Sequence, residues 1–164
     1  MASDFDRVLS RGCGVIEAMS RGANGAENEI GSRLALIMKD LDAVFAERRP
    51  SVVVVEKVFL GKNVDSAFVL GQARGVVLAL ASTHGASIRE EAARTAKKSV
   101  TGNGAAEKAE VRLILGRLLG MTEELESLPL DASDGLALAY QGWRSMIAER
   151  RAQQGPNVKN GAEL

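Results

Sequence analysis

The sequence predicts an α/β fold, and two patterns carry this prediction. One is the run SVVVVEKVF (51–59), which is β-branched and apolar almost throughout, as is typical of a strand buried on both faces of a sheet. The other is the recurrence of apolar side chains every three or four residues elsewhere, which indicates amphipathic helices. With 164 residues, 46% of them hydrophobic, the chain suits one domain. We place this domain at residues 1–154 and expect residues 155–164 to form a flexible C-terminal tail.

The predicted elements alternate between helix and strand along the chain. Residues 20–31 form the clearest loop, because their glycines and asparagines favour neither helix nor strand. A helix is expected from Ser32 to the residues before Pro50, where apolar and charged residues alternate at helical spacing. After the strand at 51–59 we expect a long helix at 63–83, a short strand near 87–91, a helix over about 105–119 and a last helix from Asp131 to about Arg151.

Composition narrows the classes of function. Lys and Arg number 21, as do Asp and Glu, so any attraction to a polyanion has to come from local patches of charge. Cys13 is the only cysteine, which excludes an internal disulfide and any cysteine-rich metal site and fits a reducing compartment. The start MASDFDR is acidic, and no uninterrupted apolar run of 18 residues occurs, so we expect neither export nor membrane insertion. A cytoplasmic protein is therefore expected.

Three carboxylates stand out. Glu56 interrupts an apolar strand, where an unpaired charge is costly to desolvate, so it needs a partner. Asp131 and Asp134 are three residues apart and project to one side of the first turn of the last helix. The simple alternative is that Asp131 caps this helix and Asp134 interacts with its dipole. If the first turn meets the strand instead, the three acids repel one another unless hard divalent cations such as Mg²⁺ or Mn²⁺ bind between them.

Three further stretches of the sequence stand out, namely VVVVEKVFLGKNVDSAFVLGQARGV (52–76), KKSVTGNGAAEKAEV (97–111) and PLDASDGLALA (129–139). They resemble the signature regions of the RuvC family of Holliday junction resolvases, and the match runs almost continuously from about Arg33 to Tyr140. The resemblance implies an RNase H-like fold, with a mixed β-sheet flanked by helices. It also implies a homodimeric, metal-dependent crossover junction endodeoxyribonuclease, which nicks opposing strands of four-way DNA junctions during recombination and repair. Two Mg²⁺ ions per active site, with Mn²⁺ as a substitute, and the RuvAB branch-migration complex as a partner follow from the same resemblance.

The resemblance supplies metal ligands position by position. Glu56, Asp131 and Asp134 match three of the four catalytic carboxylates of the family. The fourth belongs to an I-D-P-G-x-x-R-x-G motif that this chain lacks, and three alignments are open. Asp6 is the missing ligand in one; the second aligns Arg7-Val8-Leu9 with the strand before the motif and deletes the acid. In the third, GCGVIE (12–17) matches a later strand, so that the whole first hairpin is absent; in the predicted fold, the first strand or strands are accordingly shortened or missing.

This N-terminus leaves more than one function open. The first hypothesis is an active junction-resolving nuclease. The second is a junction-binding protein that has lost cleavage together with its first metal ligand. The third is a purely structural dimer, whose acidic residues only cap helices and interact with solvent.

Several residues are candidates for contact with DNA. The resemblance suggests that Phe59 stacks on bases or wedges between them, and burial in the core is the alternative. Lys97 and Lys108 match basic positions of the family, and Lys62 and Lys98 are nearby cations that would broaden the contact with phosphates; all four could instead be solvated surface. The glycines of TGNG (101–104) would let backbone N–H groups approach a phosphate.

Small residues mark one stripe of the helix predicted at 63–83. Gly71, Ala73 and Gly75 would allow another element to approach the helix backbone closely. That element is either the sheet of the same chain or the same helix of a second copy. The resemblance favours the second copy.

Overall fold

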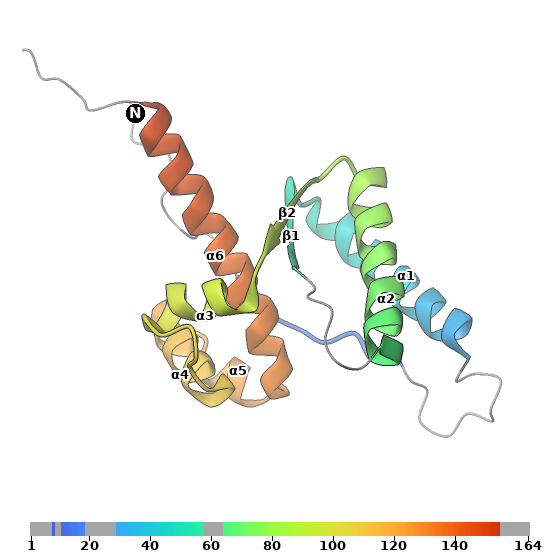
Figure 1. Cartoon of the computed structure of the whole chain (residues 1–164), viewed down its shortest axis with the longest axis horizontal. Helices are drawn as coiled ribbons and strands as arrows, with labels where there is room; N and C mark the ends of the chain where they lie inside the picture. The colour runs from blue at the N-terminus through green and yellow to red at the C-terminus, as the bar shows by residue number, and fades with distance from the viewer. Residues whose placement is uncertain (1–7, 9–10, 19–28, 58–63, 155–164) are drawn as a thin grey trace, which may run out of the picture.

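The computed structural model describes residues 8, 11–18, 29–57 and 64–154. Helices and strands alternate in the first half of this region, and helices alone form the second half, which confirms the α/β class (Figure 1). The elements are α1 (Ile30–Arg48), β1 (Val52–Glu56), α2 (Val64–Thr83), β2 (Ser87–Glu91), α3 (Ala93–Thr101), α4 (Lys108–Leu119), α5 (Thr122–Glu126) and α6 (Leu130–Gln153).

The sheet in the described region consists of β1 and β2, which pair in parallel from Val52 opposite Ser87 to Glu56 opposite Glu91. A parallel pair needs a crossover connection, and α2 supplies it. The four valines of β1 are only half-buried, less than the predicted burial on both faces, because a sheet of two strands is too narrow to cover them. Residues 12–17 adopt neither helix nor strand, so GCGVIE does not form the strand that the third alignment assigns to it, and the described sheet has no strand before β1.

Helices pack on both sides of this sheet, each side with its own core. Figure 1 shows α1 and α2 on one side of the strands and α3 to α6 on the other. The smaller core joins α1 to α2 through Phe45, Ala81 and Ala86. The larger core lies among α3 to α6 and is centred on Val111, Leu115, Leu125, Ala137 and Leu138.

Contact between α6 and β1 links the larger core to the sheet. At Gly142, a Cβ atom would lie far inside van der Waals contact with Val54 Cγ2, so only glycine lets the helix backbone come this close. The same contact fixes α6 relative to β1. It thereby determines how the acidic residues of these two elements are placed.

Two helices differ from the sequence prediction. Residues 93–101 form α3, which was not predicted because Ala96 and Val100 are its only buried side chains and the rest of its surface is polar. Residues 122–126 form the short α5, also unpredicted. The helix expected from about residue 105 begins at Lys108, after a turn at 102–107. The predicted tail at 155–164 lies outside the described residues.

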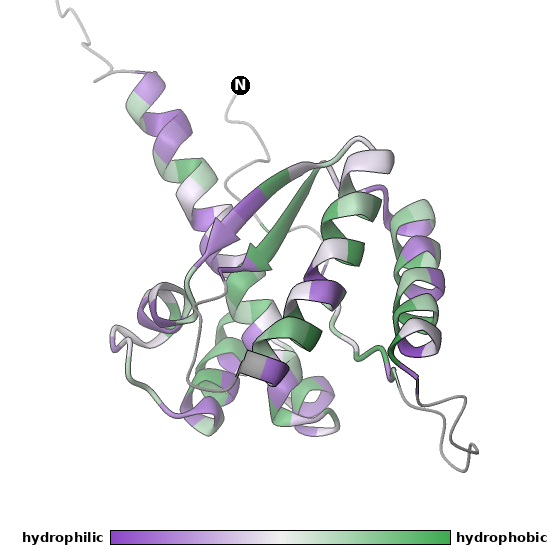
Figure 2. Cartoon of the chain, turned by 45° about the vertical axis from the view of Figure 1, so that its right-hand side comes forward, coloured by the Kyte–Doolittle hydropathy of each residue, from purple (hydrophilic) through white to green (hydrophobic). Residues whose placement is uncertain are grey.

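Apolar side chains of α2 are open to solvent in the isolated chain. Phe68 is 70% exposed and Leu70 is 51% exposed, and Figure 2 shows much of this helix in the hydrophobic colour. A Cβ atom added at Gly71 or Gly75 would meet no atom within 4 Å, so neither glycine packs against the sheet of its own chain. By length and composition alone, residues 65–83 could cross a membrane, with a mean hydropathy of 1.3. However, Arg74 is ion-paired to Glu90 of β2 at 2.5 Å, which ties this helix to the sheet.

Candidate active site

Glu56 is the last residue of β1, at the carboxyl end of the strand. Its side chain is exposed, so the expected cost of desolvation does not arise, because the strand ends before it can bury the carboxylate. Backbone pairing holds its position, since Lys57 N–H donates to Glu91 O at 2.8 Å directly after it. Carboxyl ends of parallel strands are where α/β proteins place functional groups.

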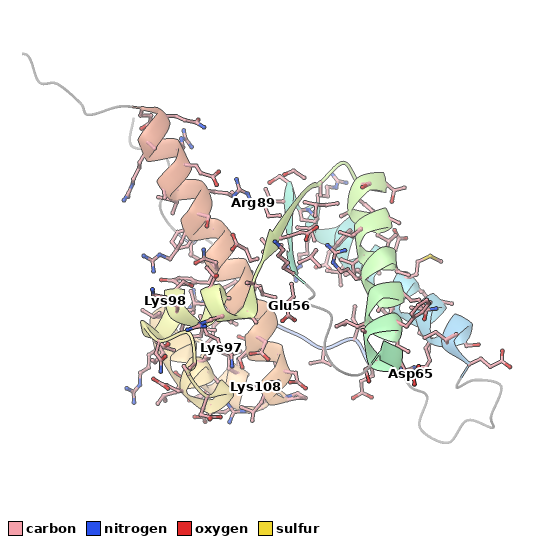
Figure 3. All side chains as sticks on the ribbon, in the orientation of Figure 1. Glu56, Asp65, Arg89, Lys97, Lys98 and Lys108 are labelled. Carbon is pink, nitrogen blue, oxygen red and sulfur yellow. The ribbon has the colours of Figure 1, made fainter. Side chains whose placement is uncertain are left out.

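A cavity of about 310 Å³ brings Glu56 together with residues from three helices. Asp134 enters it from α6, Lys97 from α3 and Lys108 from α4. Its apolar lining consists of Ala93, Ala96, Ala137 and Leu138. Figure 3 labels Glu56, Lys97 and Lys108 around this region. Two carboxylates and two ammonium groups therefore share one cavity, although they come from four elements.

Lys108 connects the two aspartates of α6. Its Nζ donates to Asp131 Oδ1 and, at 3.0 Å, to Asp134 Oδ2. These hydrogen bonds, the one to Asp131 foremost, raise the pKa of Lys108 well above its ordinary value. The spacing of three residues therefore does place both aspartates on one side of the helix, where they face a single cation.

Capping does not explain the two aspartates. Pro129 occupies the N-cap position of α6, and no side chain caps the helix, so Asp131 is not the cap. Asp131 does lie in the first turn, where a negative charge interacts favourably with the helix dipole. Its side chain is 81% exposed, whereas that of Asp134 is 32% exposed, which leaves Asp134 as the aspartate that lines the cavity.

Carboxylate oxygens are the ligands that hard divalent cations prefer, so the donor chemistry of Glu56 and Asp134 fits such an ion. The three predicted acidic residues nevertheless come together only in part, because Glu56 and Asp134 line the cavity and Asp131 does not. Among the residues that the structure describes, no group of three or more His, Cys, Asp or Glu side chains could hold a metal ion. The ammonium of Lys108 lies between Asp131 and Asp134 instead, and it has to withdraw before an ion can use both carboxylates.

Lys97 and the turn after α3 form a connected unit. Lys97 Nζ donates to Ala106 O at 3.0 Å. Within the turn, Thr101 Oγ1 accepts from Asn103 N–H, and Asn103 Oδ1 accepts from Ala105 N–H. The N–H of Gly102 donates to Lys98 O. Because these backbone donors already have partners, the prediction that TGNG cradles a phosphate is wrong for most of the turn.

The remaining predicted residues are Lys98, Asp6, Phe59 and Lys62. Lys98 follows Lys97 directly but lines a separate groove. Asp6, Phe59 and Lys62 lie outside the described residues. Cys13, which had no predicted role, donates a weak hydrogen bond from Sγ to Ala132 O at 3.3 Å and so ties the N-terminal segment to α6.

The arrangement of these residues within the fold defines a class of protein. Glu56 at the carboxyl end of β1 shares its cavity with Asp134 of α6, so the protein belongs to the class of α/β proteins with an acidic site at the strand ends. The family model "Crossover junction endodeoxyribonuclease RuvC" matches residues 7–141. The chain therefore belongs to the RuvC family.

Individual relatives agree with this assignment. A crossover junction endodeoxyribonuclease RuvC from Chlorobaculum parvum is 41% identical over 134 residues, which cover 82% of this chain and 67% of the relative. One from Bdellovibrio bacteriovorus is 47% identical over 106 residues, which cover 62% of this chain and 61% of the relative. The matches thus span about two thirds of the length of these relatives.

Solved structures match as well. The structure of Thermus thermophilus RuvC in complex with a Holliday junction substrate superposes with a TM-score of 0.67 at 26% identity. The superposition covers 76% of this chain and 75% of that chain. This likeness confirms the RNase H-like fold.

Proposed function

We propose that this protein is a metal-dependent endonuclease that resolves four-way DNA junctions by paired nicks in opposing strands. The observation that carries the proposal is the shared cavity of Glu56, Asp134, Lys97 and Lys108. Carboxylates that can bind a cation and ammonium groups that can bind a phosphate are the two requirements of metal-assisted phosphodiester cleavage. The names of the relatives and the junction in the T. thermophilus complex support the choice of substrate.

Glu56, Asp134 and Asp131 are the proposed metal ligands, with Mg²⁺ as the ion and Mn²⁺ as its substitute. Bound there, the metal supplies an activated water and stabilises the leaving oxygen. Lys108 has two proposed roles. Its ammonium neutralises Asp131 and Asp134 before the cation binds, and after binding it is available to a DNA phosphate. Asp6 stays a prediction for the fourth ligand.

Contact with DNA is proposed to run mainly through phosphates. Lys97 and Lys108 both reach the cavity, so they can hold the backbone of the strand to be cut. Phosphate contacts position a nucleic acid without reading its sequence, so we expect the geometry of the junction to determine most of the affinity. Phe59 and Lys62 stay predictions for contacts with bases and phosphates.

A homodimer is part of the proposal, because paired nicks require two sites. The exposed side of α2 that carries Phe68, Gly71 and Gly75 is the proposed contact with a second copy. A two-fold axis through this face would bring the same surface of both copies together and relate their two cavities. Action in the cytoplasm and association with the RuvAB branch-migration complex belong to the same proposal.

A second candidate function is junction binding without cleavage. The partial gathering of acids favours it, because a lysine rather than a third carboxylate completes the contacts of Asp131 and Asp134 in the described region. The two candidates differ in one assay, in which the purified protein is incubated with a labelled four-way junction in Mg²⁺, in Mn²⁺ and in EDTA. If paired nicks appear in Mg²⁺ or Mn²⁺ and not in EDTA, the result supports the nuclease hypothesis. Binding without cuts in either metal supports the second candidate, and equal binding to linear duplex contradicts both.

A further inference from the structure

An open groove of about 400 Å³ lies between α3 and α6, separate from the cavity described above. Its walls carry two cations, three hydroxyl groups and one carboxamide, and no carboxylate lines it. The polar residues are Thr95, Lys98, Ser99, Gln141, Arg144 and Ser145. Such a set of donors and positive charges is suited to phosphate oxygens.

Arg144 is held in place on one wall of the groove. Its NH1 donates to Ser99 O at 2.9 Å across the two helices, and its guanidinium carbon lies 5.9 Å from the centre of the Tyr140 ring. The side chain is exposed despite these contacts. Because a guanidinium has five N–H donors, those not used on Ser99 can bind a ligand with little further loss of conformational entropy.

Lys98 provides the second cation from the opposite wall. It is exposed and forms no ion pair with any residue of the described region. The carboxylates nearby reduce this charge only in part. Glu149 is engaged by Arg89, with Oε1 accepting from NH1 at 2.8 Å, and Glu91 approaches the groove only through a 3.4 Å contact with Ser145 Oγ.

The groove and the cavity lie on opposite sides of α3. Lys97 points into the cavity and Lys98, one residue later, into the groove; Figure 3 labels both lysines on this helix. A helix with its side chains is about 10–12 Å across. At about 3.4 Å of axial rise per nucleotide, a DNA strand covers that distance in roughly three nucleotides. One strand can therefore place a phosphate at each lysine.

We propose that the α3–α6 groove binds backbone phosphates of the DNA strand a few nucleotides away from the one held in the cavity, with Arg144 and Lys98 as the charged contacts. This inference rests on the proposed function, because it takes four-way DNA as the ligand. The protein would then have two phosphate sites, one in the cavity and one in the groove. Since the groove contacts the backbone alone, it strengthens binding to junction and linear DNA alike.

The test is the double variant Lys98→Ala/Arg144→Gln. Binding to a fluorescent four-way junction is measured in Ca²⁺ over a series of salt concentrations. Loss of two phosphate contacts is expected to weaken binding about tenfold and to lower the slope of log affinity against log salt by about 2. The matched control, Lys39→Ala/Arg48→Gln on α1, removes the same charge far from the groove and is expected to leave the slope unchanged. Equal slopes for the two double variants would contradict the proposal that the groove binds phosphates.

Two further measurements separate the possible failures. Because Arg144 also contacts Ser99, a variant that keeps this arginine, Lys98→Glu, has to weaken binding as well, and a melting temperature is recorded for each variant. If the wild-type protein and Lys98→Glu bind the junction equally well, the proposed phosphate site in the groove is wrong, and the proposed function is unaffected. Wild-type protein that binds neither junction nor linear duplex contradicts the groove and the proposed function together.

Discussion

The Nζ atom of Lys108 lies 3.0 Å from Asp134 Oδ2, and the same ammonium also donates to Asp131. One lysine of α4 therefore balances two acidic residues on the first turns of α6. Without a positive charge between them, the two carboxylates would repel each other. Lys108 thus neutralises the two aspartates, and a divalent ion bound by them would have to compete with its ammonium.

This competition predicts the behaviour of Lys108→Met. Removing the ammonium is expected to raise the affinity for Mn²⁺ severalfold, because Asp131 and Asp134 are then available to the metal. The same variant is expected to bind DNA more weakly, since a phosphate contact is lost. Calorimetric titration with Mn²⁺ checks the first effect, with Lys39→Met as the control of equal charge. A Mn²⁺ affinity equal to or below that of wild type would show that the lysine does not compete.

Packing of α6 on β1 predicts that alanine substitutions at two glycines of α6 change the free energy of unfolding in opposite directions. Gly142→Ala forces a methyl group into Val54 and is expected to lower the free energy of unfolding by about 1–3 kcal/mol. Gly135→Ala meets no atom within 4 Å and is expected to raise it by about 0.5–1 kcal/mol, because alanine favours helix over glycine. Urea denaturation of both variants measures the difference. Equal effects would contradict the close contact of α6 with the sheet.

The exposed face of α2 predicts the oligomeric state. Phe68→Arg places a charge at a side chain that is 70% exposed in the single chain. If α2 meets a second copy there, the variant is expected to be monomeric while its melting temperature changes little. Light scattering after gel filtration measures the mass. The control is Met38→Arg on α1, where the side chain is 50% exposed, and this variant is expected to stay dimeric. A dimeric Phe68→Arg protein would rule out this face.

Cys13 reports on the docking of the N-terminal segment against α6. Burial raises the pKa of its thiol above the ordinary value of 9.0, so the neutral form is favoured in the folded protein. This contribution to stability is complete below pH 9.0 and is lost as the pH rises through the pKa of the folded state. Alkylation by iodoacetamide is therefore expected to be slower in the native chain than in urea, with its midpoint at higher pH. A native midpoint at or below that in urea would contradict docking.

Local patterns in the sequence predicted most of the described elements. The β-branched run of β1 indicates a strand, and the apolar residues of α2 indicate a helix, without reference to the rest of the chain. The strand at 87–91 was predicted with the observed bounds. Helix α3 was missed because its helical conformation depends on burying Ala96 and Val100 against α4 and α6, a contact that no local pattern reveals.

The site was predictable only in part, for the same reason. Spacing alone placed Asp131 and Asp134 on one side of a helix. The bridge by Lys108 depends on how α4 packs against α6, and the exposure of Glu56 depends on where β1 ends. Arg144 was overlooked because its significance depends on α3, the helix that was missed.

The proposed nuclease activity depends on a divalent cation held by Glu56 and Asp134 in one cavity. Its most direct test measures Mn²⁺ affinity and Mg²⁺-dependent nicking of a four-way junction for Glu56→Gln and Asp134→Asn, with Asp40→Asn on α1 as the control. We expect both site variants to bind the junction, to bind Mn²⁺ more weakly and to leave it uncut, while the control behaves as wild type. A Glu56→Gln protein that binds Mn²⁺ and nicks the junction like wild type would contradict the claim.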